Sequence, residues 1–347
     1  MQLLVATLAH EQHIAIIDPG IDDTAQASVE RIEVGAAPWA VAVDPADAAS
    51  TGTAEAAVPI AYVTTAEGLA VVDLETRSRT ALVPYLTMPT SVGYGEYRAG
   101  GLGLAVSPDG SRVYAAVGSS LGSYSIEVFD TASQSFVAQI PVGLRPFDVA
   151  IAPDGSWVAS IDHDAFTVTV IDTATLTART IEVAPFGTTG GLASWEKPHY
   201  GSVTPEGRLL LPYQGSVVVS LDPKTGTMEH LPQHANSHAH GTDFLGSTLL
   251  TVGTGSFGSA TGEPNLSILD MATGQERLVP MRVPHENVAG WTAANGDVYA
   301  AVAGGNTREE GWDGVTLVRL ADLTQREIAV PGYPQDIAAF MVRIVRP

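Results

Sequence analysis

Histidine recurs at one position of a repeat in this chain of 347 residues. His199, His240 and His285 each lie near the start of an apolar stretch that opens a unit of roughly 45 residues. Because a repeat fold brings equivalent positions together, the three imidazoles are predicted to meet at one site. Neutral imidazole binds zinc, copper and iron, and three such ligands leave a coordination position for water or substrate. The spacing therefore predicts a divalent transition-metal centre that holds zinc, copper or iron.

Two more histidines extend the candidate ligand set. His238 lies two residues before His240, so on a strand both side chains point to the same face and either could be the ligand. His10 follows an apolar stretch as His163 follows the stretch 157–162, which gives both the same place in the repeat. We expect His238 and His10 among the metal ligands. The alternative for His10 and His163 is that both are exposed loop residues.

Groups that transfer protons lie beside these ligands in the sequence. Tyr200 and Glu286 directly follow His199 and His285, and Asp148 takes the same position in an earlier unit. With His163, they are predicted to be the catalytic residues, because such side chains can act as general acids and bases. Without metal, the histidines themselves could fill that role near neutral pH. A polar, water-filled channel with no chemistry is the remaining interpretation.

The repeat predicts antiparallel strands in groups of four. Residues 146–183 contain four apolar or alternating stretches separated by turns rich in Pro, Asp and Gly, and residues 102–141 repeat the pattern. The third strand of each unit is predicted to end in aspartate or an equivalent residue, at Asp18, Asp73, Asp130, Asp172, Asp222, Asp270 and Leu320. The chain begins on a second-strand pattern and ends on a first-strand pattern at 335–340. The last strand is therefore predicted to complete the first unit and close a ring.

Particular sequence motifs resemble a known group. Tyr62-Val63-Thr64-Thr65, the Pro-Asp-Gly turns and the stretch Val-Ile-Asp-Thr-Ala-Thr at 170–175 resemble YVTN-type seven-bladed β-propellers of the lactonase-like and cytochrome d1-like group. The resemblance covers nearly the whole chain and is clearest over residues 100–185. It implies an all-β fold with one seven-bladed propeller domain over residues 1–347. Such propellers include enzymes, electron-transfer modules and binding scaffolds, so the resemblance does not choose among functions.

Composition narrows the classes of partner. The net charge of −21, with only 17 Lys and Arg residues, argues against nucleic acid, which proteins bind largely by neutralising phosphates. The lack of cysteine excludes disulfides, thiolate catalysis and sulfur ligands. No apolar run approaches the roughly 18 residues of a membrane helix, and no signal-peptide pattern is present. We expect a cytoplasmic monomer with a small-molecule substrate and no membrane partner.

Longer loops are expected on the histidine side of the ring. They span 184–198, 230–239, 253–264 and 303–313, and they supply Phe186, Trp195, Phe257 and Trp312 as candidate apolar walls of a pocket. The leading hypothesis is a metal-dependent enzyme, with lyase or isomerase chemistry favoured over lactone hydrolysis or metal-dependent oxidation. The alternative is a non-catalytic propeller that binds a ligand or protein partner through the same face.

Overall fold

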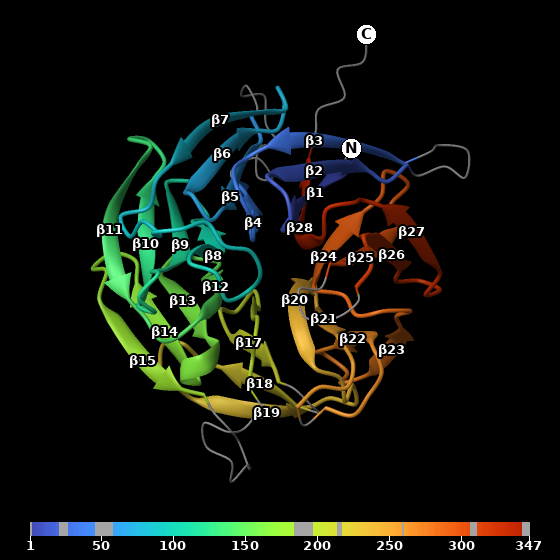
Figure 1. Ribbon diagram of the computed structural model, residues 1–347. Helices are drawn as coiled ribbons and strands as arrows, with labels where there is room; N and C mark the ends of the chain where they lie inside the picture. The colour runs from blue at the N-terminus through green and yellow to red at the C-terminus, as the bar shows by residue number, and fades with distance from the viewer. Residues whose placement is uncertain are drawn as a thin grey trace, which may run out of the picture.

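Seven four-stranded antiparallel sheets surround a central axis in the described part of the chain (Figure 1). A computed structural model describes residues 2–20, 27–45, 58–183, 197–213, 217–258, 260–305 and 311–341. The predicted fold class, an all-β propeller of seven blades, is confirmed. None of the helices in these ranges reaches the length and hydropathy needed to span a membrane.

The blades follow one another along the chain, and the strands of each run in order from the innermost to the outermost position. Blades 1 to 4 are β28 (Pro334–Met341), β1 (Gln2–Leu8), β2 (His13–Asp18), β3 (Ser28–Glu33); β4 (Val41–Val43), β5 (Ile60–Thr64), β6 (Leu69–Asp73), β7 (Ser78–Val83); β8 (Gly100–Val106), β9 (Arg112–Gly118), β10 (Tyr124–Asp130), β11 (Ser135–Pro141); and β12 (Pro146–Ile151), β13 (Trp157–Asp162), β14 (Thr167–Asp172), β15 (Ala178–Glu182). Blades 5 to 7 are β16 (Ser202–Val203), β17 (Leu209–Pro212), β18 (Val217–Leu221), β19 (Met228–Pro232); β20 (Ala239–Leu245), β21 (Thr248–Gly253), β22 (Asn265–Asp270), β23 (Glu276–Pro280); and β24 (Asn287–Thr292), β25 (Val298–Ala303), β26 (Gly314–Arg319), β27 (Gln325–Ala329).

Aspartates stabilise the turns that follow the third strands. Asp130, Asp172 and Asp270 each end such a strand and accept N–H groups from residues two or three positions further along. Such side-chain bonds satisfy turn N–H groups that have no ladder partner. The predicted ends of these three strands are confirmed.

The ring is closed by pairing of the first and last strands. Strand β28 lies beside β1 (Figure 1), with Leu4 opposite Ala339 and Ala6 opposite Ile337. Blade 1 therefore takes its innermost strand from the C-terminal part of the chain, as the sequence pattern predicts. Pairing with β28 covers the edge of β1, which would otherwise be open to another molecule.

Apolar side chains fill the space between neighbouring blades. One buried cluster joins Tyr62 of blade 2, Phe129 of blade 3 and Phe147 of blade 4. Burial of this surface is the main stabilising contribution to such a fold, and it fixes the innermost strands relative to one another. These strands surround a central cavity of about 510 Å³. Residues at or just before the first residues of the innermost strands form the candidate site.

Candidate metal centre

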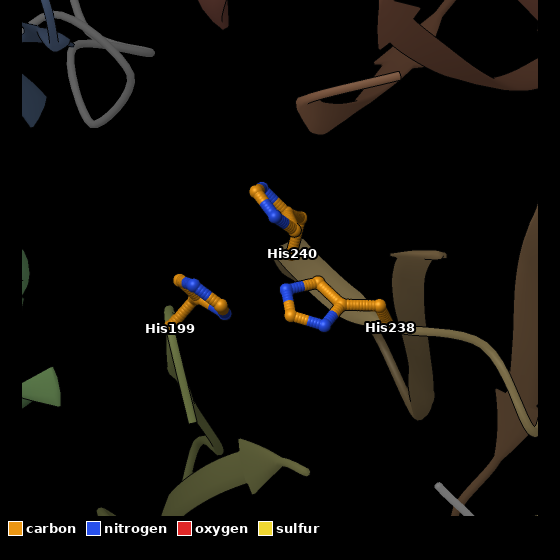
Figure 2. A group of neighbouring side chains, drawn as sticks. All are labelled: His199, His238 and His240. Atoms are coloured by element: carbon orange, nitrogen blue, oxygen red, sulfur yellow. The ribbon is translucent and has the colours of Figure 1, made fainter. Parts of the chain in front are cut away.

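Three buried histidines form a compact group at adjacent blades. One ring nitrogen from each of His199, His238 and His240 lies within 4.8 Å of the others, so the group could hold a metal ion. Figure 2 shows His238 and His240 on one segment and His199 facing them from another. His199 precedes β16, His238 directly precedes β20, and His240 is the second residue of β20. The alternation of side chains along an extended chain explains why both His238 and His240 face His199.

Hydrogen bonds orient two of these imidazoles. Nδ1 of His199 lies 3.1 Å from the carbonyl oxygen of Ala239, and Nδ1 of His240 lies 3.0 Å from Oε2 of Glu286. An acceptor at Nδ1 favours the tautomer with its proton there, which places the lone pair on Nε2. Metal-ligating histidines are commonly held by a carbonyl or carboxylate in this way. Glu286 is thus placed to position a ligand.

A fourth histidine adjoins the group. The ring centroid of His163 lies 3.9 Å from that of His199. His163 begins a short 3₁₀ helix, η2 (His163–Ala165), and its Nδ1 lies 2.8 Å from Oδ1 of Asp164. The expectation of an exposed loop histidine does not hold for His163, which is buried.

Asp164 is the charged partner behind His163. Its carboxylate also accepts hydrogen bonds from Nη1 of Arg145 at 2.5 Å and Nζ of Lys197 at 2.7 Å. Burial acts to raise the pKa of Asp164, but the bonds from His163 and Lys197 outweigh it and hold this pKa well below its usual range. The carboxylate is therefore ionised at neutral pH.

Close packing of the innermost strands identifies the equivalent residues of different blades. A Cβ added to Gly103 in β8 would lie 2.5 Å from the Cα of Asp148 in β12, and one on Gly241 in β20 would lie 2.4 Å from the Cα of Asn287 in β24. Asp148 and Asn287 also accept the N–H of the residue that follows each. Asn287 is therefore the counterpart of Asp148.

This register gives Glu286 the position that His240 has in blade 6. Oε2 of Glu286 accepts a bond from Nε2 of Gln335 at 3.2 Å in addition to its contact with His240. Three equivalent residues thus form a chain of contacts from blade to blade: His240 of blade 6 contacts Glu286 of blade 7, which contacts Gln335 of blade 1. The sequence repeat predicts His285 at this position, but the structure places the next residue, Glu286, there. A shift of one residue turns a strand side chain to the other face.

His285 consequently does not join the other histidines. Its Nδ1 lies 2.7 Å from the carbonyl oxygen of Val283, and its Nε2 lies 3.0 Å from Oγ1 of Thr316 in β26. Both nitrogens therefore have partners within blade 7. Burial lowers the pKa of His285 to about 4, so the ring is neutral at physiological pH.

His10 also lies apart from the group of three. Its ring stacks on that of Tyr333, with centroids 4.1 Å apart and an interplanar angle of 9°. The side chain is exposed, as the alternative interpretation of this loop anticipates. The equivalent loop of blade 4 differs because Asp164 holds His163 against His199.

Tyr200 lies between the histidines and the central cavity. Its ring centroid is 6.5 Å from that of His199 and 6.3 Å from that of His240, and the residue also lines the cavity. Burial and the nearby carboxylate of Glu286 raise the pKa of Tyr200 well above 10. The phenol is therefore protonated at neutral pH and can donate a hydrogen bond.

Asp148 joins two blades. Its Oδ2 accepts the N–H of Gly201 at 2.9 Å and its Oδ1 accepts the N–H of Val149 at 2.8 Å. Burial raises the pKa of Asp148 to about 6, although both hydrogen bonds act to lower it. Asp336 makes the corresponding link from blade 1 to Val41 of blade 2. These contacts indicate that Asp148 holds neighbouring innermost strands together.

Aromatic rings border the group on two sides. The ring of Phe147 stacks 5.8 Å from that of His199, and the ring of Phe257 meets that of His238 edge-on at 4.9 Å. Trp312 instead lies under the guanidinium of Arg282, 5.4 Å away. The other two predicted wall residues, Phe186 and Trp195, lie outside the described residues.

Lys197 and Asp164 are site residues that the sequence pattern does not single out. A repeat signal is present for Lys197, because Arg145, Lys197 and His238 each lie two residues before the position of Phe147, His199 and His240. A comparison of the residues two positions before Phe147, His199 and His240 would have placed Arg145, Lys197 and His238 in one group. Asp164 has no such signal, since its role depends on the turn at η2.

No family model and no curated protein matches the chain. Solved structures do share its fold. Hydrazine synthase of Kuenenia stuttgartiensis matches with a TM-score of 0.58 and 18% identity, over 82% of this chain and 76% of that chain. Dihydro-heme d1 dehydrogenase NirN in complex with DHE matches with a TM-score of 0.55 and 16% identity, over 83% of this chain and 55% of that chain.

A functionally unknown protein from Desulfotomaculum acetoxidans DSM 771 matches with a TM-score of 0.62 and 13% identity, over 97% of this chain and 98% of that chain. At these identities the similarity concerns the fold. Two of the three structures are enzymes by name, so this fold occurs in enzymes.

Proposed function

We propose that the protein is a metal-dependent enzyme of the YVTN-type propeller group, in which His199, His238 and His240 bind one divalent transition-metal ion. The observation that carries this proposal is the set of three buried imidazoles with ligand atoms within 4.8 Å. Nitrogen donors favour zinc, copper or iron over magnesium or calcium, which prefer oxygen. A metal ion bound there would act as a Lewis acid toward a small organic substrate.

Residues around the three ligands supply the remaining functions. Glu286 orients His240 through Nδ1, and the Ala239 carbonyl orients His199. Tyr200 donates a hydrogen bond from its phenol to a substrate oxygen. His163 transfers a proton at Nε2, with Asp164 holding its Nδ1.

Elimination or isomerisation is the reaction type that we favour over lactone hydrolysis or metal-dependent oxidation. Both favoured reactions need a proton removed at one atom and delivered at another. The rings of His163 and Tyr200 both lie near His199, with centroids 3.9 and 6.5 Å from it. Two proton-carrying groups near one ligand suit such a transfer.

Metal content tests the ligand set. Protein purified without an affinity tag is analysed by elemental mass spectrometry, as wild type and as His199→Ala/His238→Ala/His240→Ala. We expect near one equivalent of zinc, copper or iron in the wild type and its loss in the triple variant. His10→Ala is the matched control and should retain the metal, because His10 stacks on Tyr333 away from the group. Absence of metal after reconstitution, or its retention in the triple variant, contradicts the proposal.

A non-catalytic propeller that binds a ligand is the second candidate. It is favoured by the central cavity of about 510 Å³, which Tyr200 lines and which could hold a ligand without any reaction. Once a substrate is found, loss of turnover in His163→Gln with metal retained supports the enzyme. Binding of a small molecule with no turnover by the metal-loaded wild type favours the scaffold.

A further inference from the structure

Two cationic side chains lie next to the histidine group. Nη1 of Arg145 and Nζ of Lys197 donate to the carboxylate of Asp164, which also contacts His163. Arg145 directly precedes β12, and Lys197 precedes β16 on the neighbouring blade. The Lys197 side chain is only 9% exposed, whereas that of Arg145 is 38% exposed. Arg145 can therefore reach a molecule arriving from solvent.

Positive charge exceeds negative charge among these three groups. Asp164 balances one of the two cations, which leaves one net positive charge in a chain whose total charge is −21. Lys197, the buried cation, pairs with Asp164 at 2.7 Å, so the remaining positive charge is that of the partly exposed Arg145. Arg145 has five N–H donors in a planar fork that matches a carboxylate, so it can contact Asp164 and a second anion together.

Backbone hydrogen bonds hold the cationic groups in place. The N–H of His163 donates to the carbonyl oxygen of Arg145 at 3.1 Å, and the N–H of Asp164 donates to that of Leu144 at 3.1 Å. The turn carrying His163 and the segment carrying Arg145 are thus fixed to each other. Such an arrangement is preorganised for binding a ligand, because little conformational entropy remains to be lost.

Tyr97 and Leu144 form an apolar surface beside Arg145, and the buried ring of Phe147 links Tyr97 to His199. The guanidinium lies 4.1 Å from the ring centroid of Tyr97, which is 55% exposed. The Tyr97 ring lies 6.1 Å from that of Phe147, and Phe147 stacks on His199. Leu144 adds a half-exposed side chain beside Arg145. A ligand with its anionic end at Arg145 would place apolar atoms along this surface.

We propose that Arg145, Tyr97 and Leu144 form a substrate subsite for a carboxylate with an apolar body, such as an arylalkyl carboxylic acid. The carboxylate binds Arg145, with Lys197 adding positive charge behind Asp164. The apolar body lies over the exposed side chains of Tyr97 and Leu144. That this molecule then reacts rests on the proposed metal-dependent function, whereas its binding at the subsite does not.

Calorimetric titration tests the subsite with three probes. Phenylacetate carries both features, phenylacetamide lacks the charge, and acetate lacks the ring. Each is titrated into chelator-treated protein and into cobalt(II)-loaded protein, as wild type, Arg145→Met and Tyr97→Ser. Arg282→Met is the matched control, because Arg282 also lies over an aromatic ring and pairs with a carboxylate, Glu327, on blade 7. Circular dichroism checks that each variant is folded.

Metal-free wild type should bind phenylacetate about 10-fold more tightly than phenylacetamide, since a hydrogen bond to a charged group contributes that much. Arg145→Met should lose this preference and Arg282→Met should keep it. Tyr97→Ser should weaken binding of phenylacetate and phenylacetamide alike. Failure to take up cobalt while these results hold would overturn the metal proposal and leave the subsite intact.

Several outcomes would overturn the subsite itself. They are equal binding of the acid and the amide, an unchanged preference in Arg145→Met, binding of acetate as tight as that of phenylacetate, and no binding of phenylacetate at millimolar concentration. Binding that needs cobalt and ignores Arg145→Met would also overturn it, because the metal would then hold the carboxylate.

Discussion

Glu286 connects the histidine group to the neighbouring blades. It accepts hydrogen bonds from Nδ1 of His240 and from Gln335, in a buried position. A carboxylate behind a ligating imidazole fixes its tautomer and makes it a better ligand. The sequence pattern predicts that Glu286 moves protons, and its contact with Nδ1 of His240 also suits it to orient that ring.

Glu286→Gln is expected to weaken metal binding about 10-fold, because a neutral amide polarises His240 less than a carboxylate does. Competition with a chromophoric chelator measures the dissociation constant. Glu327→Gln, which changes an exposed carboxylate, should leave that constant unaltered. Equal affinity in Glu286→Gln and wild type would show that the contact does not support a ligand.

His285 makes stability depend on pH. Burial lowers its pKa from 6.5 to about 4, so between these values the unfolded chain binds a proton that the folded chain does not. The free energy of unfolding therefore falls as the pH is lowered through this window. His285→Gln should remove on the order of 3 kcal/mol of the change between pH 7 and pH 4.

Urea denaturation at a series of pH values measures this difference. His10→Gln is the control, since its exposed ring should leave the pH dependence as in the wild type. An identical pH dependence in wild type and His285→Gln would mean that the buried ring titrates normally.

The histidine site is predictable only in part from the sequence. His199 and His240 are found because a repeat places equivalent Cα atoms on one ring, and the two-residue spacing brings in His238. His285 is misplaced by one residue in the register of blade 7. A side chain that depends on a turn, as His163 does at η2, is beyond what strand periodicity encodes.

Innermost strands approach one another so closely that some positions require glycine. A Cβ on Gly103 would lie 2.5 Å from the Cα of Asp148 and 2.7 Å from the carbonyl oxygen of Phe147. Backbone atoms cannot move aside as a flexible side chain can. The contact therefore sets the spacing of β8 and β12, and with it the position of Phe147 beside His199.

Gly103→Ala is expected to lower the free energy of unfolding by about 3 kcal/mol, the upper range for overpacking. Gly274→Ala is the comparison, because Gly274 has open space around it and only its positive φ of 71° opposes a side chain. That cost is about 1 kcal/mol. Chemical denaturation of both variants measures the values. Equal losses would mean that the strands can separate without penalty.

At the scale of elements, turn chemistry and period-two patterning predict most strands. Aspartates at the ends of third strands and Pro-Asp-Gly turns are local signals, and local signals survive in a single sequence. The register between blades is set by contacts such as Gly103 with Asp148, which join segments distant in the chain. Those contacts leave no local mark, so the alignment of blade 7 from sequence alone is wrong by one residue.

The whole molecule depends on one inter-terminal contact. Strand β28 pairs with β1 along most of its length, and Asp336 of β28 also accepts the N–H of Val41 in blade 2. Loss of β28 would expose the edge of β1 and remove the seventh wall of the central cavity. Both effects act on the entire ring because each blade is supported by its two neighbours.

A chain lacking residues 334–347 is expected not to fold cooperatively, since blade 1 would lose its innermost strand. Near-ultraviolet circular dichroism and size-exclusion chromatography report the result. A chain ending at Met341 retains β28 and controls for shortening itself. Adding a peptide of residues 334–341 to the shorter chain should restore structure. A native spectrum without the peptide would contradict the role given to closure.

Closure by β28 also imposes an order on biosynthesis. During translation, β1 emerges from the ribosome early, yet its partner is made only after the other six blades. The nascent chain therefore carries an unpaired β-edge throughout elongation, in a segment rich in aliphatic residues. Chains that must form contacts between residues so far apart in the sequence fold slowly. Cellular yield should accordingly depend on chaperones that shield this edge until the last strand arrives.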